Sequence, residues 1–77
     1  MSKLPNLSGY EVVKVLSLFG FKFKRQKGSH VLLVKENGKK IGVIVPLHKE
    51  LKKGTVLSII KKAGISKEEF ISAYKKL

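Results

Sequence analysis

Cysteine is absent from this 77-residue sequence, and only five of its residues are acidic. Without cysteine the chain can form neither a disulfide bond nor a thiolate metal site, and it has no cysteine nucleophile. The remaining ligands of note are two histidines and five acidic residues, which are too sparse for a convincing metal site. We therefore expect no metal ion and no other cofactor.

Long hydrophobic runs are also missing. The apolar stretch Val12–Phe19 is interrupted by Lys14 and Ser17, and no run approaches the roughly 18 residues of a membrane span. The first eight residues are mostly polar and show no hydrophobic segment of a signal peptide. These features predict a cytoplasmic protein that does not act at a membrane.

Positive charge dominates what is present, because 17 lysines and arginines against five acidic residues give a formal net charge of +12. Such a surplus on a small surface attracts polyanions, of which nucleic acid is the commonest in the cytosol. A surface kept basic only for solubility would normally mix both signs of charge. The residues expected to hold a nucleic acid are Lys22, Lys24, Arg25, Lys27, Lys52 and Lys53.

Helical signals stand at both ends of the chain. Ser8 and Glu11 have the spacing of a capping box, and apolar residues at helical spacing then predict a helix over 9–19, ended by Gly20 in the left-handed conformation. Gly54-Thr55 offers an N-cap for a second helix at 55–63. A second capping box at Ser66 predicts a third helix at 67–76.

The middle of the chain has the two-residue period of strands. Phe21 and Phe23 alternate with lysines, the apolar run resumes after Gly28-Ser29 over 30–35, and a third run covers 40–45 before Pro46. Asn37-Gly38 predicts a hairpin turn in which both central residues have positive φ. We expect a single α+β domain over residues 1–77, of α-β-β-β-α(-α) order with a three-stranded antiparallel sheet. This is the order of the double-stranded-RNA-binding domain.

Both faces of the expected sheet carry apolar residues. Leu32, Val34, Ile41, Val43 and Val45 are grouped on one face, whereas Val31, Leu33 and Ile44 have the opposite parity. A sheet with helices on one side normally leaves its other face polar. Either the C-terminal helix covers the second face, or that face is exposed for a protein partner.

His30 is the candidate for chemistry, because it opens the second strand directly after a basic run. Imidazole can both accept and donate protons near neutrality. RNA carries its own nucleophile, the 2′-hydroxyl, so that a base, an acid and cations around the phosphate suffice to cleave it without a metal ion. Gly28 and Ser29 offer backbone amides to a phosphate. A lone histidine at the start of a strand can equally be structural.

His48 follows the third strand, and an antiparallel hairpin brings the end of that strand close to the start of the second. His30 and His48 are therefore expected to share one end of the sheet. His48 could complete an acid–base pair, contact a phosphate or merely cap the loop.

Three segments together resemble the HicA toxin family of mRNA interferases. They are Arg25-Gln26-Lys27-Gly28-Ser29-His30, then Val45-Pro46-Leu47-His48-Lys49-Glu50-Leu51, and Ile59-Ile60-Lys61-Lys62-Ala63-Gly64-Ile65-Ser66. The resemblance implies a double-stranded-RNA-binding-domain-like fold and an endoribonuclease that arrests translation. It also implies that His30 is catalytic, with Gly28 and Ser29 beside it, and that a HicB-type antitoxin covers the site. The alternatives are a non-catalytic RNA-binding module and a subunit that chiefly binds a protein partner.

Overall fold

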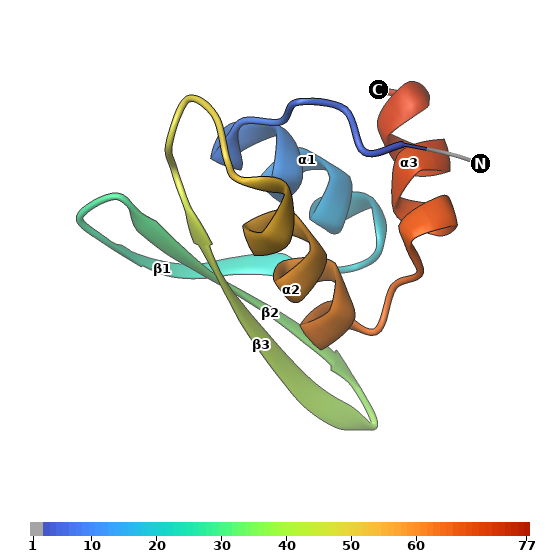
Figure 1. Ribbon diagram of the computed structural model, residues 1–77. Coiled ribbons are helices and arrows are strands. Elements are labelled where there is room, and N and C mark those ends of the chain that lie inside the picture. The colour runs from blue at the N-terminus through green and yellow to red at the C-terminus, as the bar shows by residue number, and fades with distance from the viewer. Residues whose placement is uncertain (1–2) are drawn as a thin grey trace.

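A computed structural model describes residues 3–77 as three helices gathered on one side of a three-stranded antiparallel sheet (Figure 1). In chain order the elements are α1 (Gly9–Leu18), β1 (Lys22–Lys27), β2 (His30–Asn37), β3 (Lys39–Pro46), α2 (Lys53–Ala63) and α3 (Lys67–Lys75). This order confirms the predicted α+β fold of the double-stranded-RNA-binding-domain type. Within residues 3–77, no helix combines the length and the apolarity needed to cross a membrane.

Both predicted capping boxes form. The Ser8 hydroxyl accepts a hydrogen bond from the Glu11 backbone N–H at 3.1 Å, and the Glu11 carboxylate accepts one from the Ser8 backbone N–H at 2.9 Å. Ser66 and Glu69 repeat this arrangement at the start of α3. Because a capping box needs only two residues three positions apart, it can be recognised in the sequence.

The start of α2 differs from the prediction. Its N-cap is Lys52, which makes no side-chain capping bond, instead of Gly54-Thr55. The N–H of Leu51 donates to the Leu7 carbonyl at 2.8 Å and ties the chain there to the segment before α1. Helical bonding then begins at once, with the Lys52 carbonyl accepting from Val56.

The hairpin between β2 and β3 is centred on a single residue. Asn37 pairs with Lys39, so that only Gly38, at φ +79°, has a left-handed conformation. The expected positive φ at Asn37 is wrong, because this residue stays in the strand. The register continues without a shift to the pair His30–Pro46.

The core lies between the helices and one face of the sheet. Val31 and Leu33 lie opposite Val45 and Val43 and are buried with them. The sequence-based grouping of Leu32 and Val34 with Val43 and Val45 is therefore wrong. A turn centred on one residue pairs odd positions with odd positions, and directly opposed residues share a face. Phe70, Leu7, Leu16, Val12, Val15 and Val56 are the other fully buried large side chains.

No helix in the described part of the chain, residues 3–77, covers the second face of the sheet, here called the outer face (Figure 1). The C-terminal helix α3 packs against α1, where the Tyr74 hydroxyl donates to the Glu11 carboxylate at 3.3 Å (Figure 1). Ile44 is consequently 58% exposed, and Leu32 and Val34 are half-buried. The structure therefore excludes the first alternative, in which the C-terminal helix covers this face.

Strand β1 extends beyond the cover of the helices, which pack mainly on β3. All six of its residues are exposed, and Phe23 is 62% exposed although it lies opposite the buried Leu33. The sequence predicted that Phe21 and Phe23 would form the buried side of a half-buried strand. Only Phe21, which precedes β1, is buried.

Candidate functional site

The turn between β1 and β2 positions His30. Lys27 pairs with His30 across a two-residue turn in which Gly28 has φ +60° and Ser29 does not have positive φ. This combination is that of a type II′ turn, which requires glycine at its first central position. The Gln26 side-chain amide donates to the Gly28 carbonyl at 2.9 Å and braces the turn. His30 therefore begins β2 directly after a turn that is fixed by the conformation of Gly28 and by the side chain of Gln26.

Backbone hydrogen bonds hold His48 in the loop after β3. The N–H of Leu47 donates to the Ser29 carbonyl at 2.6 Å, which continues the β2–β3 ladder beyond Pro46. The N–H of Gly9, the first residue of α1, donates to the His48 carbonyl at 2.9 Å. The loop is thus tied to the turn before β2 and to the start of a helix.

Gly9 is required at this contact by close approach. A Cβ atom built at residue 9 would lie 1.9 Å from the Pro46 carbonyl oxygen and 2.8 Å from the Leu47 Cα atom. No side chain fits there, because both neighbours are backbone atoms. The sequence showed Gly9 only as part of a helix start, and nothing local to it indicates a contact with residues so far along the chain.

The two histidines meet at one end of the sheet, as the hairpin topology predicts. Their ring centroids lie 6.3 Å apart, and the ring planes are inclined at 74°. Both residues are exposed, so that both imidazoles are open to a substrate.

A β-bulge places two cations beside His30. The register between β1 and β2 shifts between Phe23 and Arg25, so that Lys24 is an extra residue in β1. Beyond the bulge, Arg25 lies opposite Leu32 and Lys27 lies opposite His30. Strict alternation would have separated Lys22 from Arg25 and Lys27, whereas the bulge brings all three onto the outer face. The sequence predicts the cations but not their common face.

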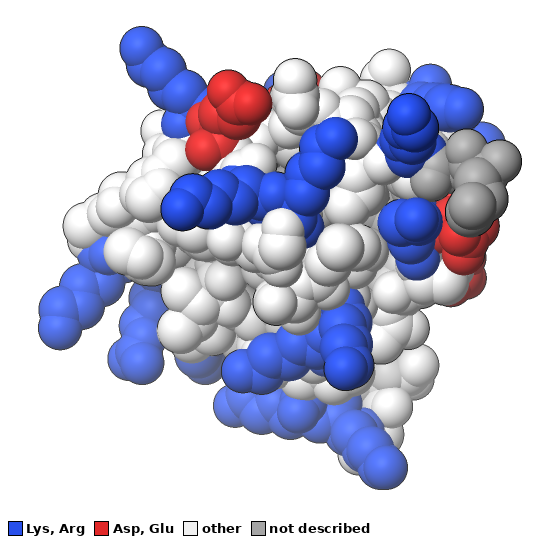
Figure 2. All heavy atoms as spheres, viewed as in Figure 1, with Lys and Arg blue, Asp and Glu red and all other residues white. Residues whose placement is uncertain are grey.

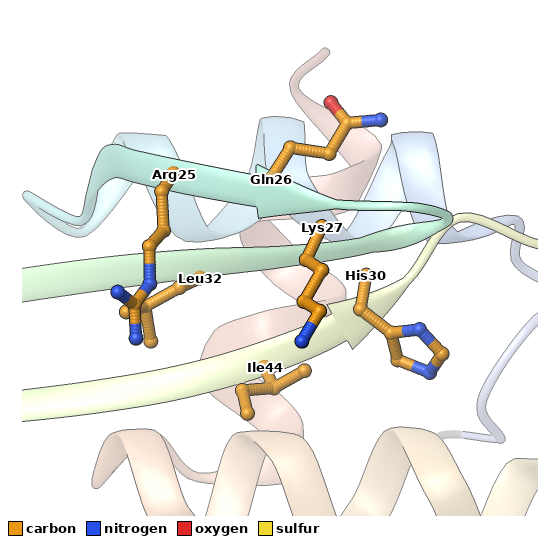
Figure 3. A pocket seen from close by; sticks show the side chains of 6 residues that line it. All are labelled: Arg25, Gln26, Lys27, His30, Leu32 and Ile44. Atoms are coloured by element: carbon orange, nitrogen blue, oxygen red, sulfur yellow. The ribbon is translucent and has the colours of Figure 1, made fainter.

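An open hollow of about 730 Å³ lies over this end of the outer face. Its lining comprises Arg25, Gln26, Lys27, His30, Leu32 and Ile44. In Figure 3 the side chains of Arg25, Lys27 and His30 project to the same side as Leu32 and Ile44, whereas Gln26 points away. The hollow therefore combines an apolar floor with cations and one imidazole. The sequence analysis grouped Leu32 with the residues of the buried face and so missed it as part of the site, whereas it placed Ile44 on the second face, where the structure has it.

The other predicted RNA-binding lysines are exposed but lie outside this lining. Lys22 lies opposite Val34 on the outer face, and Lys24 is the residue of the bulge. Lys52 and Lys53 stand at the N-terminus of α2, whose first turn has no acidic residue. The positive end of the helix dipole adds to their charge.

Basic side chains cover much of the face seen in Figure 2. Acidic side chains appear there only in small areas near its upper and right margins. The face is therefore electropositive as a whole, and a polyanion is attracted over a wider area than the hollow alone.

The titratable pair Glu11 and Tyr74 belongs to the contact between α1 and α3. The backbone N–H of Ser8 bonds to the Glu11 carboxylate and holds its pKa below the ordinary value. The negative charge of Glu11 in turn raises the pKa of Tyr74. Tyr74 is therefore engaged in joining two helices and is a poor proton donor for chemistry.

No group of three or more histidine or acidic side chains in the described range 3–77 is close enough to form a metal site. The functional groups that the hollow and its rim bring together are two imidazoles, one guanidinium and one ammonium group. Such a set can move protons and can stabilise negative charge on a phosphate.

Comparison with protein-family models matches residues 9–65 to the family described as the HicA toxin of bacterial toxin–antitoxin systems. The matched region runs from the first residue of α1 to just beyond α2 and so includes both histidines. No curated protein sequence matches the chain.

Proposed function

Since this chain belongs to the HicA toxin family and is therefore a toxin with endoribonuclease activity, we propose that His30 cleaves RNA without a metal ion and that a HicB-type antitoxin neutralises it. The observation that carries the proposal is the exposed imidazole of His30, placed between Lys27 and His48 at the end of a basic sheet face. RNA supplies the nucleophile, so the protein needs only proton transfer and charge stabilisation.

In the proposed reaction, one neutral imidazole accepts the proton of the 2′-hydroxyl while its oxygen attacks the adjacent phosphorus. The bond from phosphorus to the 5′-oxygen breaks, and that oxygen takes a proton from an imidazolium. The products are a 2′,3′-cyclic phosphate and a free 5′-hydroxyl. We assign the base to His30 and the acid to His48; ring centroids 6.3 Å apart are close enough for both imidazoles to reach one phosphate.

Arg25 and Lys27 are proposed to hold the reacting phosphate. The guanidinium donates two parallel hydrogen bonds to phosphate oxygens, and the ammonium acts as a point charge. Both side chains project over the hollow with His30 (Figure 3). Their charge opposes the extra negative charge that forms on the phosphate oxygens in the transition state. The backbone amides of Gly28 and Ser29 lie at the turn that precedes His30 and can donate to the same group.

Contacts to the RNA backbone are proposed to extend beyond the hollow. Lys22 and Lys24 continue the basic surface along β1, and Lys52 and Lys53 add a second cationic point at the start of α2. Contacts of this kind fix a nucleic acid by its phosphates and its shape, not by its sequence. Binding is therefore expected to weaken steeply as the salt concentration rises.

The test is cleavage of a defined RNA by purified protein in EDTA. We expect wild-type protein to cut and to leave cyclic phosphate ends, and we expect His30→Ala to fold normally by circular dichroism but to cut about 10²- to 10⁴-fold more slowly. Cleavage by folded His30→Ala at the wild-type rate would refute the role of His30. Salt-sensitive binding without cleavage by the wild type, with or without EDTA, would instead indicate a non-catalytic RNA-binding module.

The antitoxin is proposed to dock on the outer face, where Ile44 is 58% exposed beside the histidine hollow. A partner seated there would cover both the apolar floor and His30. Ile44→Lys should weaken antitoxin binding, whereas Leu57→Lys, at an apolar residue of α2 that is 42% exposed, should not. Equal affinities of the two variants would exclude the outer face as the docking surface.

A further inference from the structure

The two edges of the sheet differ in chemistry. At one edge, β1 carries four basic residues and a bulge, both of which discourage pairing with a further strand. At the other edge, β3 is free of bulges, and residues 41–47 contain no charged side chain. Among the described elements, β2 is the only strand that pairs with β3. An apolar and regular edge of this kind is a template for strand addition.

The hydrogen-bonding pattern of β3 identifies the groups at that edge. Leu47 donates its N–H to the Ser29 carbonyl, and Pro46, which lies opposite His30, has no N–H to donate. Odd-numbered residues of β3 therefore bond to β2, because bonded and non-bonded pairs alternate in an antiparallel ladder. It follows that the backbone N–H and C=O groups of Lys40, Gly42 and Ile44 face outward.

These outward groups lie within a strongly basic surface. Lys39 and Lys40 stand at the start of β3, and Lys49 follows its end. The whole chain has a net charge of +12. Two copies of the chain would bring like charges together along this edge, whereas an acidic segment would be attracted.

We propose that β3 is the edge on which the antitoxin adds a strand, an extended segment with acidic side chains that pairs with residues 40–44. This inference rests on the proposed function, because it presupposes an antitoxin that binds the chain. The added strand would bond to the outward backbone groups of Lys40, Gly42 and Ile44, as in other cases of β-augmentation. It would lie beside the apolar part of the outer face and thereby extend the antitoxin contact from Ile44 to the sheet edge.

A matched pair of variants at Gly42 tests the proposal. Gly42→Pro removes one outward N–H and leaves the bonds to β2 intact, and proline is tolerated in this orientation on an edge strand. Gly42→Ala retains the N–H, and its Cβ would meet only the Leu32 Cδ1 atom, at 3.6 Å. With the proposed HicB-type antitoxin as the probe, we expect Gly42→Pro to bind about tenfold more weakly than Gly42→Ala. Both variants should cleave RNA as the wild type does.

Amide hydrogen exchange on the wild-type chain provides a test that needs no variant. In the free protein, the amides of Gly42 and Ile44 should exchange faster than those of Val43 and Val45. Antitoxin binding should slow the exchange of Gly42 and Ile44 at least tenfold. Lys40→Glu should also weaken binding, because it reverses a charge at the proposed edge.

Several results would overturn the proposal. Equal affinities of Gly42→Pro and Gly42→Ala, or unchanged exchange at Gly42 and Ile44 in the complex, would exclude strand addition while leaving the ribonuclease and its antitoxin in place. A free chain that is a dimer in light scattering and that Gly42→Pro converts to a monomer would place a second copy at this edge. Failure of the wild type to cut RNA or to bind the antitoxin would instead refute the proposed function.

Discussion

Replacing Gly9 with alanine is expected to destabilise the protein, although alanine normally stabilises a helix relative to glycine. The added Cβ would lie 1.9 Å from the Pro46 carbonyl oxygen, whereas real Cβ atoms essentially never come closer than 3.0 Å. The chain must therefore separate by at least about 1.1 Å, the difference between these two distances. A shift of that size breaks the 2.9 Å hydrogen bond from Gly9 to the His48 carbonyl.

The expected cost combines two effects. Overpacking against backbone that cannot rotate away costs roughly 1–3 kcal/mol, and the lost hydrogen bond adds about 1 kcal/mol. We therefore expect the free energy of unfolding to fall by about 2–4 kcal/mol, out of a total of roughly 5–15 kcal/mol for a small domain. In a chain of this length, that loss lowers Tm by about 10 °C or more.

Gly54→Ala is the matched control. Gly54 lies in the first turn of α2, and a Cβ there would meet no heavy atom within 4 Å. This change should raise the free energy of unfolding by about 0.5–1 kcal/mol, because glycine is the poorer helix former. Both variants can be measured by urea and thermal unfolding followed by circular dichroism. If the two changes shift Tm in the same direction, the close contact between α1 and the His48 loop does not exist.

Three further predictions concern the site and its support. His48→Ala should slow RNA cleavage about 100-fold without changing RNA affinity to the same extent, and an unchanged rate would remove His48 from the reaction. Lys27→Gln should lower the slope of log affinity against log salt concentration by roughly one, whereas Lys75→Gln on α3 should leave it unchanged. The pKa of Glu11 is lowered in the folded state, so its carboxylate stabilises the fold at pH values above 4.5, the ordinary pKa of the group. This contribution is lost as the pH falls through the lower pKa of the folded state. Urea unfolding below pH 4.5 should therefore show a smaller loss of stability on acidification for Glu11→Gln than for the wild type, and identical profiles would contradict this role.

The features that could be predicted from the sequence are those encoded by neighbouring residues. The capping boxes at Ser8 and Ser66 need only a spacing of three residues, and both form. The meeting of His30 and His48 follows from the hairpin that joins β2 and β3, and the structure confirms it. The element order and the fold class follow from the change between helical and strand periods.

Other features depend on contacts between distant residues or on a shift of one position. The face that Leu32 occupies depends on the turn at Gly38, which centres the hairpin on one residue instead of two. The contact of Gly9 with Pro46 joins segments that are far apart in the chain. Neither leaves a pattern in the local sequence, so neither could be inferred before the strands were aligned.

The bulge at Lys24 determines on which face of the sheet Arg25 and Lys27 lie. If the strand kept its length but lost the bulge, strict alternation would place Lys24 opposite Leu32 and turn Arg25 and Lys27 toward the helices. Deleting Lys24, by contrast, would leave a regular strand in which Lys22, Arg25 and Lys27 still share the outer face. For protein engineers, the orientation of these cations therefore depends on whether the strand keeps its bulge, and not on the basic residues alone.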